Sequence, residues 1–259
     1  MKVVIFAGGL GSRISEESHL RPKPMIEIGG KPILWHIMKV YQAQGYNEFI
    51  ICLGYKGYMI KEYFMNYFVH NSDVTVDLKS NSVKVHQSNT EDFVVTLVDT
   101  GQETKTAGRL KRVKPYIQED TFMLTYGDGV ANVDLNKLCQ FHQENHRLAT
   151  VTMIQPKGKF GVIQTSEEGN VTGFVEKPHQ VGNWINGGYF VLQKDIFSYL
   201  DGPMDEVMWE QDPMLRLVEN NQLMGYKHEG FWKSMDILRD KVELEKLWLE
   251  DKAPWKIWD

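Results

Sequence analysis

The stretch Val3-Val4-Ile5-Phe6-Ala7-Gly8-Gly9-Leu10-Gly11-Ser12-Arg13 decides the fold that this sequence predicts. Its first four residues are apolar and β-prone, which predicts a buried strand. The three glycines that follow allow the backbone to turn sharply and leave its N–H groups uncovered by side chains. Arg13 adds a guanidinium that can pair with two phosphate oxygens. The stretch therefore favours a phosphate-binding loop at the carboxyl end of a first strand, and a tight turn that needs glycine for its geometry alone is the alternative.

Length and composition narrow the class of protein. The chain has 259 residues, of which 42% are apolar, and this is enough to bury a large core. A net charge of −5 provides no overall basic surface for a nucleic acid. Cys52 and Cys139 lack metal-ligand spacing and are expected to be buried thiols in a reducing compartment. Without a signal-like start or a long apolar run, the sequence predicts a soluble, cytoplasmic protein with no membrane partner.

Strand and helix patterns alternate along the chain. The sequence predicts strands near residues 3–6, 49–53, 93–98, 122–126, 150–154 and 189–192. It predicts helices near residues 33–40, 60–68, 110–113, 135–144, 211–220 and 237–249, and shorter strands at 73–78, 82–86, 161–164 and 171–175. This order favours an α/β fold, with a Rossmann-like, mixed and mostly parallel central sheet flanked by helices. We see no linker that would separate two independent domains, so residues 1–259 are expected to form one.

Ligands of such sheets bind beyond the carboxyl ends of the strands, where four polar segments of this sequence lie. They are residues 8–13, 104–109, 127–129 and 176–177. The first loop is not a dinucleotide fingerprint, since Ile14 stands where the third glycine would be needed, and no Gly-Lys-Ser/Thr closes it as in a P-loop. A triphosphate held by backbone amides, Arg13 and Lys23 explains it better. We expect the flanking prolines to exclude helix and to keep the chain extended around Lys23.

Acidic and basic side chains beyond the first loop suggest a metal and a second substrate. Asp128 lies between two glycines at a strand end, and with the more distant Asp236 it could hold Mg²⁺, which takes one or two carboxylates beside phosphates. A turn-capping role for Asp128 and a helix N-cap role for Asp236 are the alternatives. Lys177 is a candidate cation for a second anionic substrate, or part of a surface Lys-Pro turn. The turn at 186–188 allows close approach of a small polar ligand, or marks a bulge.

These motifs resemble those of the sugar-phosphate nucleotidylyltransferases. The resemblance covers essentially the whole chain and is carried by Gly8-Gly9-Leu10-Gly11-Ser12-Arg13, Pro22-Lys23-Pro24-Met25, Gly29-Gly30-Lys31-Pro32-Ile33-Leu34-Trp35-His36, Gly127-Asp128, Glu176-Lys177-Pro178 and Asn186-Gly187-Gly188. It is strongest to the members that use CTP and glucose 1-phosphate, in the stretches 50–62, 96–113, 126–130 and 230–258. Ser12 departs from the usual threonine and Ala107 from a common glycine.

The resemblance implies an activity and an assembly. The reaction is CTP plus α-D-glucose 1-phosphate giving CDP-glucose and pyrophosphate, with Mg²⁺, in pathways to 3,6-dideoxyhexoses and the O-antigen of lipopolysaccharide. It also implies a nucleotide-diphospho-sugar transferase fold, with a nucleotide-binding half of roughly 1–130 and a sugar-phosphate-binding half of roughly 131–259. A homo-oligomer is implied, a hexamer for the members that use CTP, and residues 73–86 and the aromatic tail are candidate contact surfaces.

The resemblance also assigns roles to individual residues. Arg13, Lys23 and Asp128 are the implied catalytic residues, and Asp128 and Asp236 the implied metal ligands. The implied nucleotide-binding residues are Phe6, Ala7, Gly8, Gly9, Leu10, Gly11, Ser12, Arg13, Lys23, Thr104, Arg109 and Gly127. The implied sugar-phosphate-binding residues are Glu176, Lys177, Asn186, Gly187 and Gly188.

The mechanism that we expect is a direct, in-line attack of the sugar phosphate on the α-phosphorus, without a covalent enzyme intermediate. A phosphate monoester needs no base, so His36, His86 and His142 are expected to be structural. A thymidylyl- or uridylyltransferase remains an alternative, as does a non-catalytic protein that senses sugar nucleotides.

Overall fold

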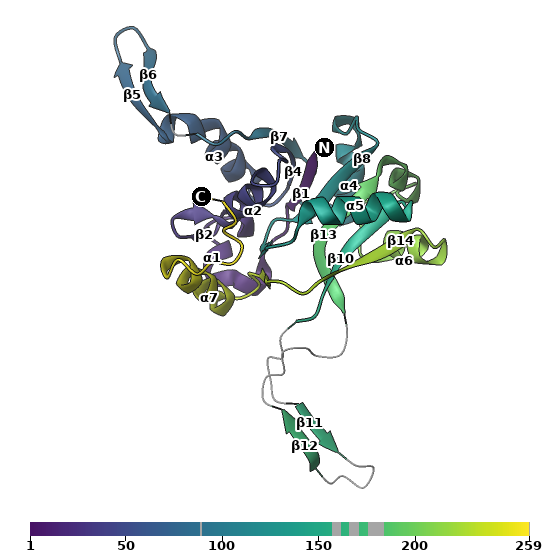
Figure 1. Cartoon of the computed structure of the whole chain (residues 1–259). Coiled ribbons are helices and arrows are strands. Elements are labelled where there is room, and N and C mark those ends of the chain that lie inside the picture. Colours follow the sequence, from purple (N-terminus) through teal and green to yellow (C-terminus); the bar gives the residue numbers. More distant parts are fainter. Residues whose placement is uncertain (89, 157–161, 166–170, 176–183, 259) are drawn as a thin grey trace.

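A seven-stranded sheet forms the centre of the molecule in a computed structural model that describes residues 1–88, 90–156, 162–165, 171–175 and 184–258 (Figure 1). In spatial order its strands are β14 (Leu223–His228), β10 (Ala149–Ile154), β13 (Ile185–Gln193), β8 (Thr121–Tyr126), β1 (Val3–Ala7), β4 (Glu48–Leu53) and β7 (Val94–Asp99). All neighbouring pairs are parallel except the two made by β13. The predicted mixed, mostly parallel sheet is confirmed.

Helices cover both faces of this sheet (Figure 1). The α-helices of the described residues are α1 (Ser15–Ser18), α2 (Ile33–Gln42), α3 (Gly57–His70), α4 (Thr106–Val113), α5 (Leu135–Asn145), α6 (Asp212–Glu219) and α7 (Leu238–Leu249). Side chains of α2, α5 and α7 form one apolar core, and side chains of α4 and α6 contribute to a second. Val3 and Ile5 of β1 enter the first core and Val4 and Phe6 the second, which explains why this strand is apolar without a break.

The direction of β13 decides which residues meet at one edge of the sheet. The other six strands end at a common edge, where the chain continues into residues 8–13, 54–56, 100–105 and 127–128. Because β13 runs antiparallel to its neighbours β8 and β10, its amino end lies at that same edge. Asn186, Gly187 and Gly188 therefore join the loops that follow β1 and β8.

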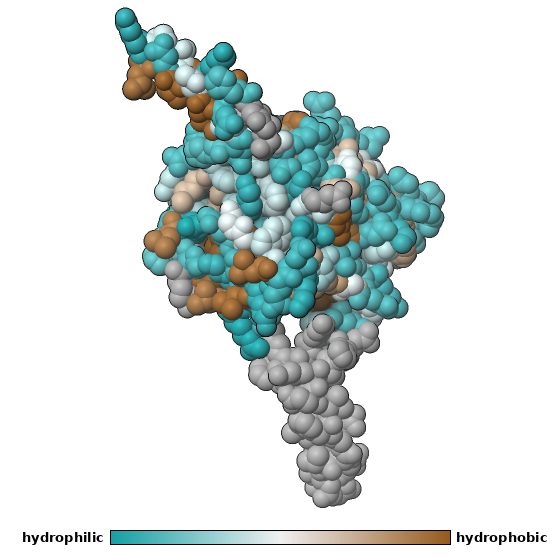
Figure 2. All heavy atoms as spheres, turned by 60° about the vertical axis from the view of Figure 1, so that its left-hand side comes forward, coloured by the Kyte–Doolittle hydropathy of each residue, from teal (hydrophilic) through white to brown (hydrophobic). Residues whose placement is uncertain are grey.

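Two-stranded ribbons extend the fold beyond the central sheet. They are β2 (Glu27–Ile28) with β3 (Lys31–Pro32), β5 (Ser72–Asp77) with β6 (Ser82–Ser88), β9 (Gly129–Ala131) with β15 (Trp232–Ser234), and β11 (Val162–Thr165) with β12 (Val171–Val175). The β5–β6 hairpin follows α3 and projects away from the body (Figure 1). Figure 2 shows apolar side chains gathered on this projection. Of the described residues, no helix is both long and apolar enough to cross a membrane.

Several local features differ from the sequence prediction, which did not include the short strands β9 and β15. β14 was not predicted, because its residues 223–228 mix polar and apolar types without a clear period. Residues 106–109, predicted as loop, begin α4. Lys23 was predicted in extended chain, but Lys23–Met25 form a 3-10 turn in which the Met25 N–H bonds to the Pro22 carbonyl at 2.8 Å. Pro24 tolerates this turn because a helical first turn needs no N–H at that position.

Candidate functional site

A cavity of about 520 Å³ lies at the edge of the sheet where these loops meet. It is lined by Phe6, Ala7, Gly9, Gly11, Ser12, Arg13, Lys23, Pro24, Thr106, Thr125, Tyr126, Gly127, Asp128, Gly129, Asn186, Gly187, Gly188, Tyr189, Met208, Glu210, Trp232, Ser234 and Asp236. The cavity thus brings together most of the predicted site residues, although they come from four distant parts of the chain.

The first loop lies along one wall of the cavity. Gly11 has φ +66°, a conformation that glycine adopts without strain, and its carbonyl accepts the Ile14 N–H at 3.0 Å. This bend starts the short 3-10 turn Ser12–Ile14, from which the exposed Arg13 side chain reaches the cavity. Gly8 and Leu10 are not among the lining residues: Gly8 packs against Arg109, and the Leu10 side chain is exposed.

Lys23 lies between the two predicted metal ligands. Its Nζ is 2.6 Å from Asp128 Oδ2 and 2.9 Å from Asp236 Oδ1, and Arg13 Nη1 is 3.2 Å from the same Asp236 oxygen. Burial alone would lower the pKa of Lys23, but the two carboxylates outweigh it and raise that pKa above its usual value. Burial would raise the pKa of Asp236, but Lys23, Ser234 and Arg13 together lower it. The four side chains form one charged cluster.

The β9–β15 ribbon explains how Asp128 and Asp236 meet. Asp128 directly precedes β9 and Asp236 follows β15 by two residues, so pairing of the two strands brings both carboxylates to one end. The Met235 N–H donates to the Asp128 carbonyl at 2.8 Å. The buried Asp240 carboxylate accepts the N–H groups of Asp236 and Ile237 at 3.0 and 3.1 Å. The backbone of both acidic residues is thus fixed.

The cluster has the ligand chemistry of a divalent metal site. Asp128 and Asp236 already share one cationic atom, Lys23 Nζ, so their oxygens converge on a volume that a small cation can occupy. Within the residues described, no group of three His, Cys, Asp or Glu side chains converges as a metal site would need. A metal held by two carboxylates and by substrate phosphate oxygens is the arrangement that Mg²⁺ favours. The donor set therefore fits Mg²⁺.

Arg109 lies behind the first loop and is not a lining residue of the cavity. Its guanidinium is buried and donates to five oxygens: Leu53 O, Thr100 Oγ1, Gly101 O, Gly8 O and Gln102 O, at 2.8 to 3.2 Å. Gly8 has no room for a side chain here, because an added Cβ would lie 2.2 Å from Arg109 Nη1. Thr104 is likewise buried and outside the lining, whereas Thr106 faces the cavity.

The amino end of β13 forms another wall of the cavity. Gly188 has φ +79°, and a Cβ there would lie 2.7 Å from the Tyr126 ring, so glycine is required on both counts. Trp232 Nε1 donates to the Gly187 carbonyl at 2.7 Å, which fixes this end of β13 against β15. Asn186, Gly187 and Gly188 all line the cavity. Glu176 and Lys177 lie outside the described residues, so their predicted role stays a prediction.

The sequence did not single out Thr106, Tyr126, Met208, Glu210 and Trp232 as site residues, although all five line the cavity. Tyr126 could have been found, since it ends a predicted strand next to Asp128. Glu210 could not, because it lies among acidic and apolar residues without a periodic pattern. Only the packing of residues 204–210 against α4 brings it to the cavity, through bonds such as Lys105 N–H to Asp205 O.

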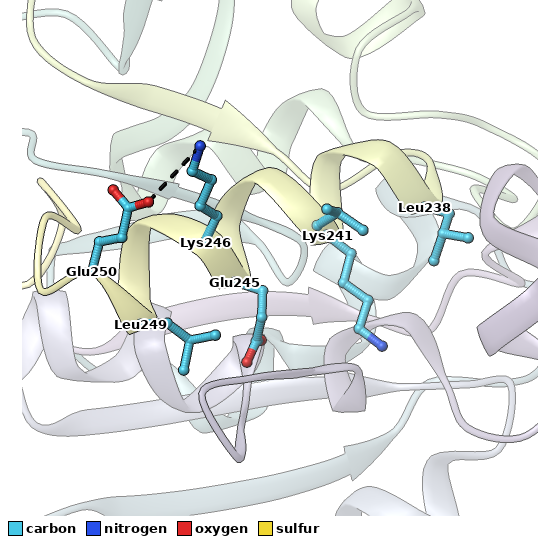
Figure 3. A pocket seen from close by; sticks show the side chains of 7 residues that line it. Leu238, Lys241, Glu245, Lys246, Leu249 and Glu250 are labelled. Atoms are coloured by element: carbon cyan, nitrogen blue, oxygen red, sulfur yellow. Dashed lines mark ion pairs between the residues drawn. The ribbon is translucent and has the colours of Figure 1, made fainter.

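A second hollow lies along the outer surface of α7 and is a poorer candidate (Figure 3). Leu238, Lys241, Val242, Glu245, Lys246, Leu249 and Glu250 line it, all from this helix and its C-terminal cap. One helix surface cannot surround a ligand, and Figure 3 shows the side chains spread along the helix instead of converging. The cavity at the edge of the sheet is the candidate active site.

Comparison with known proteins agrees with this geometry. A family profile described as "Nucleotidyl transferase" matches residues 2–237. The chain belongs to the nucleotidyl transferase family. It is 52% identical to glucose-1-phosphate cytidylyltransferase of Salmonella typhi and 44% identical to probable glucose-1-phosphate cytidylyltransferase of Bacillus subtilis, in each case over 100% of both chains. Among solved structures, HddC from Yersinia pseudotuberculosis shares the fold, with a TM-score of 0.68 and 24% identity over 95% of this chain and 99% of the other.

Proposed function

We propose that the chain transfers a cytidylyl group from CTP to α-D-glucose 1-phosphate, giving CDP-glucose and pyrophosphate. The relatives at 52% and 44% identity are named for this activity and match the chain from end to end. The observation that carries the proposal is the cluster of Lys23, Arg13, Asp128 and Asp236 beside the glycine loop. Two cations and two carboxylates at the rim of a glycine loop suit a triphosphate and a metal.

The reaction proceeds by direct displacement. A phosphate oxygen of glucose 1-phosphate attacks the α-phosphorus of CTP in line, the new P–O bond forms, and the bond to the β-phosphate breaks with release of pyrophosphate. The loop at 8–13 holds the triphosphate with its N–H groups. Arg13, exposed at the cavity, is free to turn toward the departing pyrophosphate, and Lys23 neutralises charge near the α-phosphate.

Mg²⁺ is the metal that we propose for Asp128 and Asp236. When bound, it would neutralise phosphate charge and help to orient the two substrates. Asp128 and Asp236 would hold it, while Lys23, which is bonded to both carboxylates in this structure, would turn toward the phosphates. Asp240 keeps the backbone of Asp236 in place during this exchange.

The remaining site residues belong to the same proposal. Thr104 and Arg109 support the nucleotide side, and Gly127 lies beside the ribose. Glu176, Lys177, Asn186, Gly187 and Gly188 hold the sugar phosphate, so the nucleotide half ends near residue 130. We also propose that the protein acts as a homo-oligomer, a hexamer by resemblance.

A panel of nucleotides tests the function. Purified protein is supplied with Mg²⁺, glucose 1-phosphate and CTP, UTP or dTTP in turn, and pyrophosphate release is measured. We expect the highest kcat/KM with CTP. A preference for UTP or dTTP would identify a uridylyl- or thymidylyltransferase, and binding of CDP-glucose without any turnover would indicate a sensor.

A further inference from the structure

Glu210 lies at the cavity wall and is held by hydroxyl groups from two other elements. Its Oε1 accepts the hydroxyl of Tyr126, the last residue of β8, and its Oε2 accepts the hydroxyl of Thr106, the first residue of α4, at 2.8 Å. Glu210 itself lies two residues before α6. All three side chains line the cavity, so the carboxylate is built into the site from three separate parts of the chain.

The neighbours of Glu210 fix the direction of each hydroxyl. The Trp209 N–H donates to Thr106 Oγ1 at 2.8 Å, which leaves the Thr106 proton for Glu210. Asn186 Nδ2 donates to the Tyr126 oxygen at 3.4 Å. Burial and the nearby Glu210 charge raise the pKa of Tyr126, so its hydroxyl stays protonated and donates. The carboxylate is thus oriented before any ligand binds.

This arrangement leaves Glu210 able to accept further hydrogen bonds. Each carboxylate oxygen can accept about two, and within the described residues the structure gives each one hydroxyl donor. The partners of Glu210 there are hydroxyls, whereas Asp128 and Asp236 pair with Lys23 and Arg13. A carboxylate without a paired cation repels phosphate. Glu210 must therefore face a neutral, hydrogen-donating part of a substrate.

Three parts of the substrates meet that description: the hydroxyls of the hexose, the hydroxyls of the CTP ribose and the 4-amino group of cytosine. The contacts of Glu210 favour the hexose. Through Tyr126 it is bonded to Asn186, and the Tyr126 ring packs against Gly188, so it lies at the same wall as residues 186–188 of β13. On the proposed function, residues 186–188 hold the sugar phosphate.

We propose that Glu210, oriented by Tyr126 and Thr106, accepts a hydrogen bond from a hydroxyl of the hexose 1-phosphate and so determines which hexose the enzyme uses. The inference rests on the proposed function and adds a specificity residue to it. A site built to accept a hydroxyl rejects a sugar that lacks it, because the polar group is then left without its partner.

The test compares Glu210→Gln with Glu206→Gln, a matched change at an exposed carboxylate of the same loop outside the cavity lining. For each protein, kcat/KM is measured with glucose 1-phosphate and with its 2-, 3-, 4- and 6-deoxy analogues, and KM is measured for CTP. We expect Glu210→Gln to lower kcat/KM for glucose 1-phosphate by about 10- to 100-fold, in line with loss of a hydrogen bond to a charged group. KM for CTP and the Glu206→Gln variant should stay within about twofold of wild type.

The deoxy analogues identify a direct contact. In wild type, removal of one particular hydroxyl from the sugar should lower kcat/KM about as much as the Glu210→Gln change does. In the Glu210→Gln variant, removal of the same hydroxyl should lower kcat/KM little further. Tyr126→Phe keeps the ring packed on Phe6 and Phe190. It should lower kcat/KM less than Glu210→Gln does, and the same deoxy analogue should be the one that it affects least. Thermal melting checks that each variant is folded.

Several outcomes would overturn the role of Glu210. A rise in KM for CTP alone would mean that the carboxylate faces the nucleotide, at the cytosine amino group or the ribose hydroxyls, and not the hexose. If each deoxy analogue lowered kcat/KM by the same factor in wild type and in the variant, Glu210 would contact no sugar hydroxyl. A wild type that releases no pyrophosphate with any of these sugars would instead contradict the proposed function, and the two failures are therefore distinguishable.

Discussion

The charges around Lys23 balance only because four side chains from separate parts of the chain meet. Lys23 is 8% exposed, and an ammonium this buried needs nearby negative charge. Asp128 and Asp236 provide it at 2.6 and 2.9 Å, and Arg13 adds a further positive charge at Asp236. A phosphate or a metal that enters this cluster must exchange partners with Lys23. The cluster is consequently poised to respond to substrate and less suited to a purely structural role.

For single residues of this cluster, we predict that Asp128→Asn abolishes turnover. The change keeps the shape of the side chain but removes one negative charge from the proposed metal site, and loss of such a preorganised charge costs about 100-fold or more in kcat. Asp128 is partly exposed, so the fold should stay intact. Pyrophosphate release and thermal melting measure both effects, with the exposed Asp201→Asn as control. Near-wild-type turnover at saturating Mg²⁺ would contradict the metal assignment.

At the scale of elements, Arg109 ties together the ends of three neighbouring strands. Through its five hydrogen bonds it reaches Gly8 after β1, Leu53 at the end of β4, and the residues that follow β7. Two of these carbonyls also accept a backbone N–H: Leu53 O from Thr100 at 3.0 Å and Gly8 O from Tyr55 at 3.2 Å. The guanidinium, with its planar set of donors, can satisfy several at once, which lysine cannot. It therefore holds the first loop in place from behind.

We predict that Arg109→Gln lowers the free energy of unfolding by about 3 kcal/mol, because the buried carbonyls of Leu53 and Gly8 and the buried Thr100 hydroxyl lose a charged donor. Arg112→Gln, on the same helix but with a 41% exposed side chain, should cost less than about 1 kcal/mol. Urea unfolding measures both. If Arg109 acted only by touching the nucleotide, its variant would raise KM for CTP and unfold at the wild-type urea concentration.

The elements that the sequence predicted well are those whose pattern is local. β1 is a continuous apolar run followed by glycines, and the structure has both the predicted strand and the predicted loop after it. Residues whose position depends on distant packing were not predictable. Glu210 reaches the cavity only because its loop packs on α4, and Lys23 adopts a 3-10 turn where flanking prolines suggested extended chain. Asp236 was predicted as a metal ligand from its sequence context, but only the β9–β15 ribbon explains why it meets Asp128.

At the scale of the whole molecule, two buried histidines link stability to pH. His36 Nε2 lies 2.8 Å from the Ile28 carbonyl, and its Nδ1 faces Trp255 Nε1 at 3.4 Å, so the ring is held neutral among aromatic side chains. His142 bonds to Thr150 and Gln193 at 2.8 and 3.0 Å. Burial lowers the pKa of each ring to about 4. Both fit the predicted structural role.

We predict that the protein loses stability as the pH falls from about 6.5 to about 4. In that range the unfolded chain binds protons at these two histidines and the folded chain does not, which costs about 1.4 kcal/mol per pH unit for each ring. Above pH 7 both states are neutral there and the effect vanishes. Urea unfolding between pH 4.5 and 7.5 measures how the free energy of unfolding changes with pH. His142→Gln should remove about half of the pH dependence that the two histidines contribute. An unchanged slope in that variant would rule out His142 as a source.

The projecting β5–β6 hairpin is the feature that a single copy of the chain explains least. Leu78 is 89% exposed at its tip, and Val76 and Val83 are more than half exposed. A two-stranded hairpin alone is at best marginally stable in water, and exposed apolar side chains on it add a further cost. A second copy of this chain would cover them, in keeping with the proposed homo-oligomer.

We therefore predict that the double change Val76→Glu with Val83→Glu lowers the mass of the assembly, measured by light scattering, because burial of two carboxylates in a contact between copies is unfavourable. Lys79→Glu, a charge change at the exposed tip of the same hairpin, should leave the mass unchanged. An unaltered mass in the double variant would exclude the hairpin as the contact, and a monomeric wild type would contradict the oligomer itself.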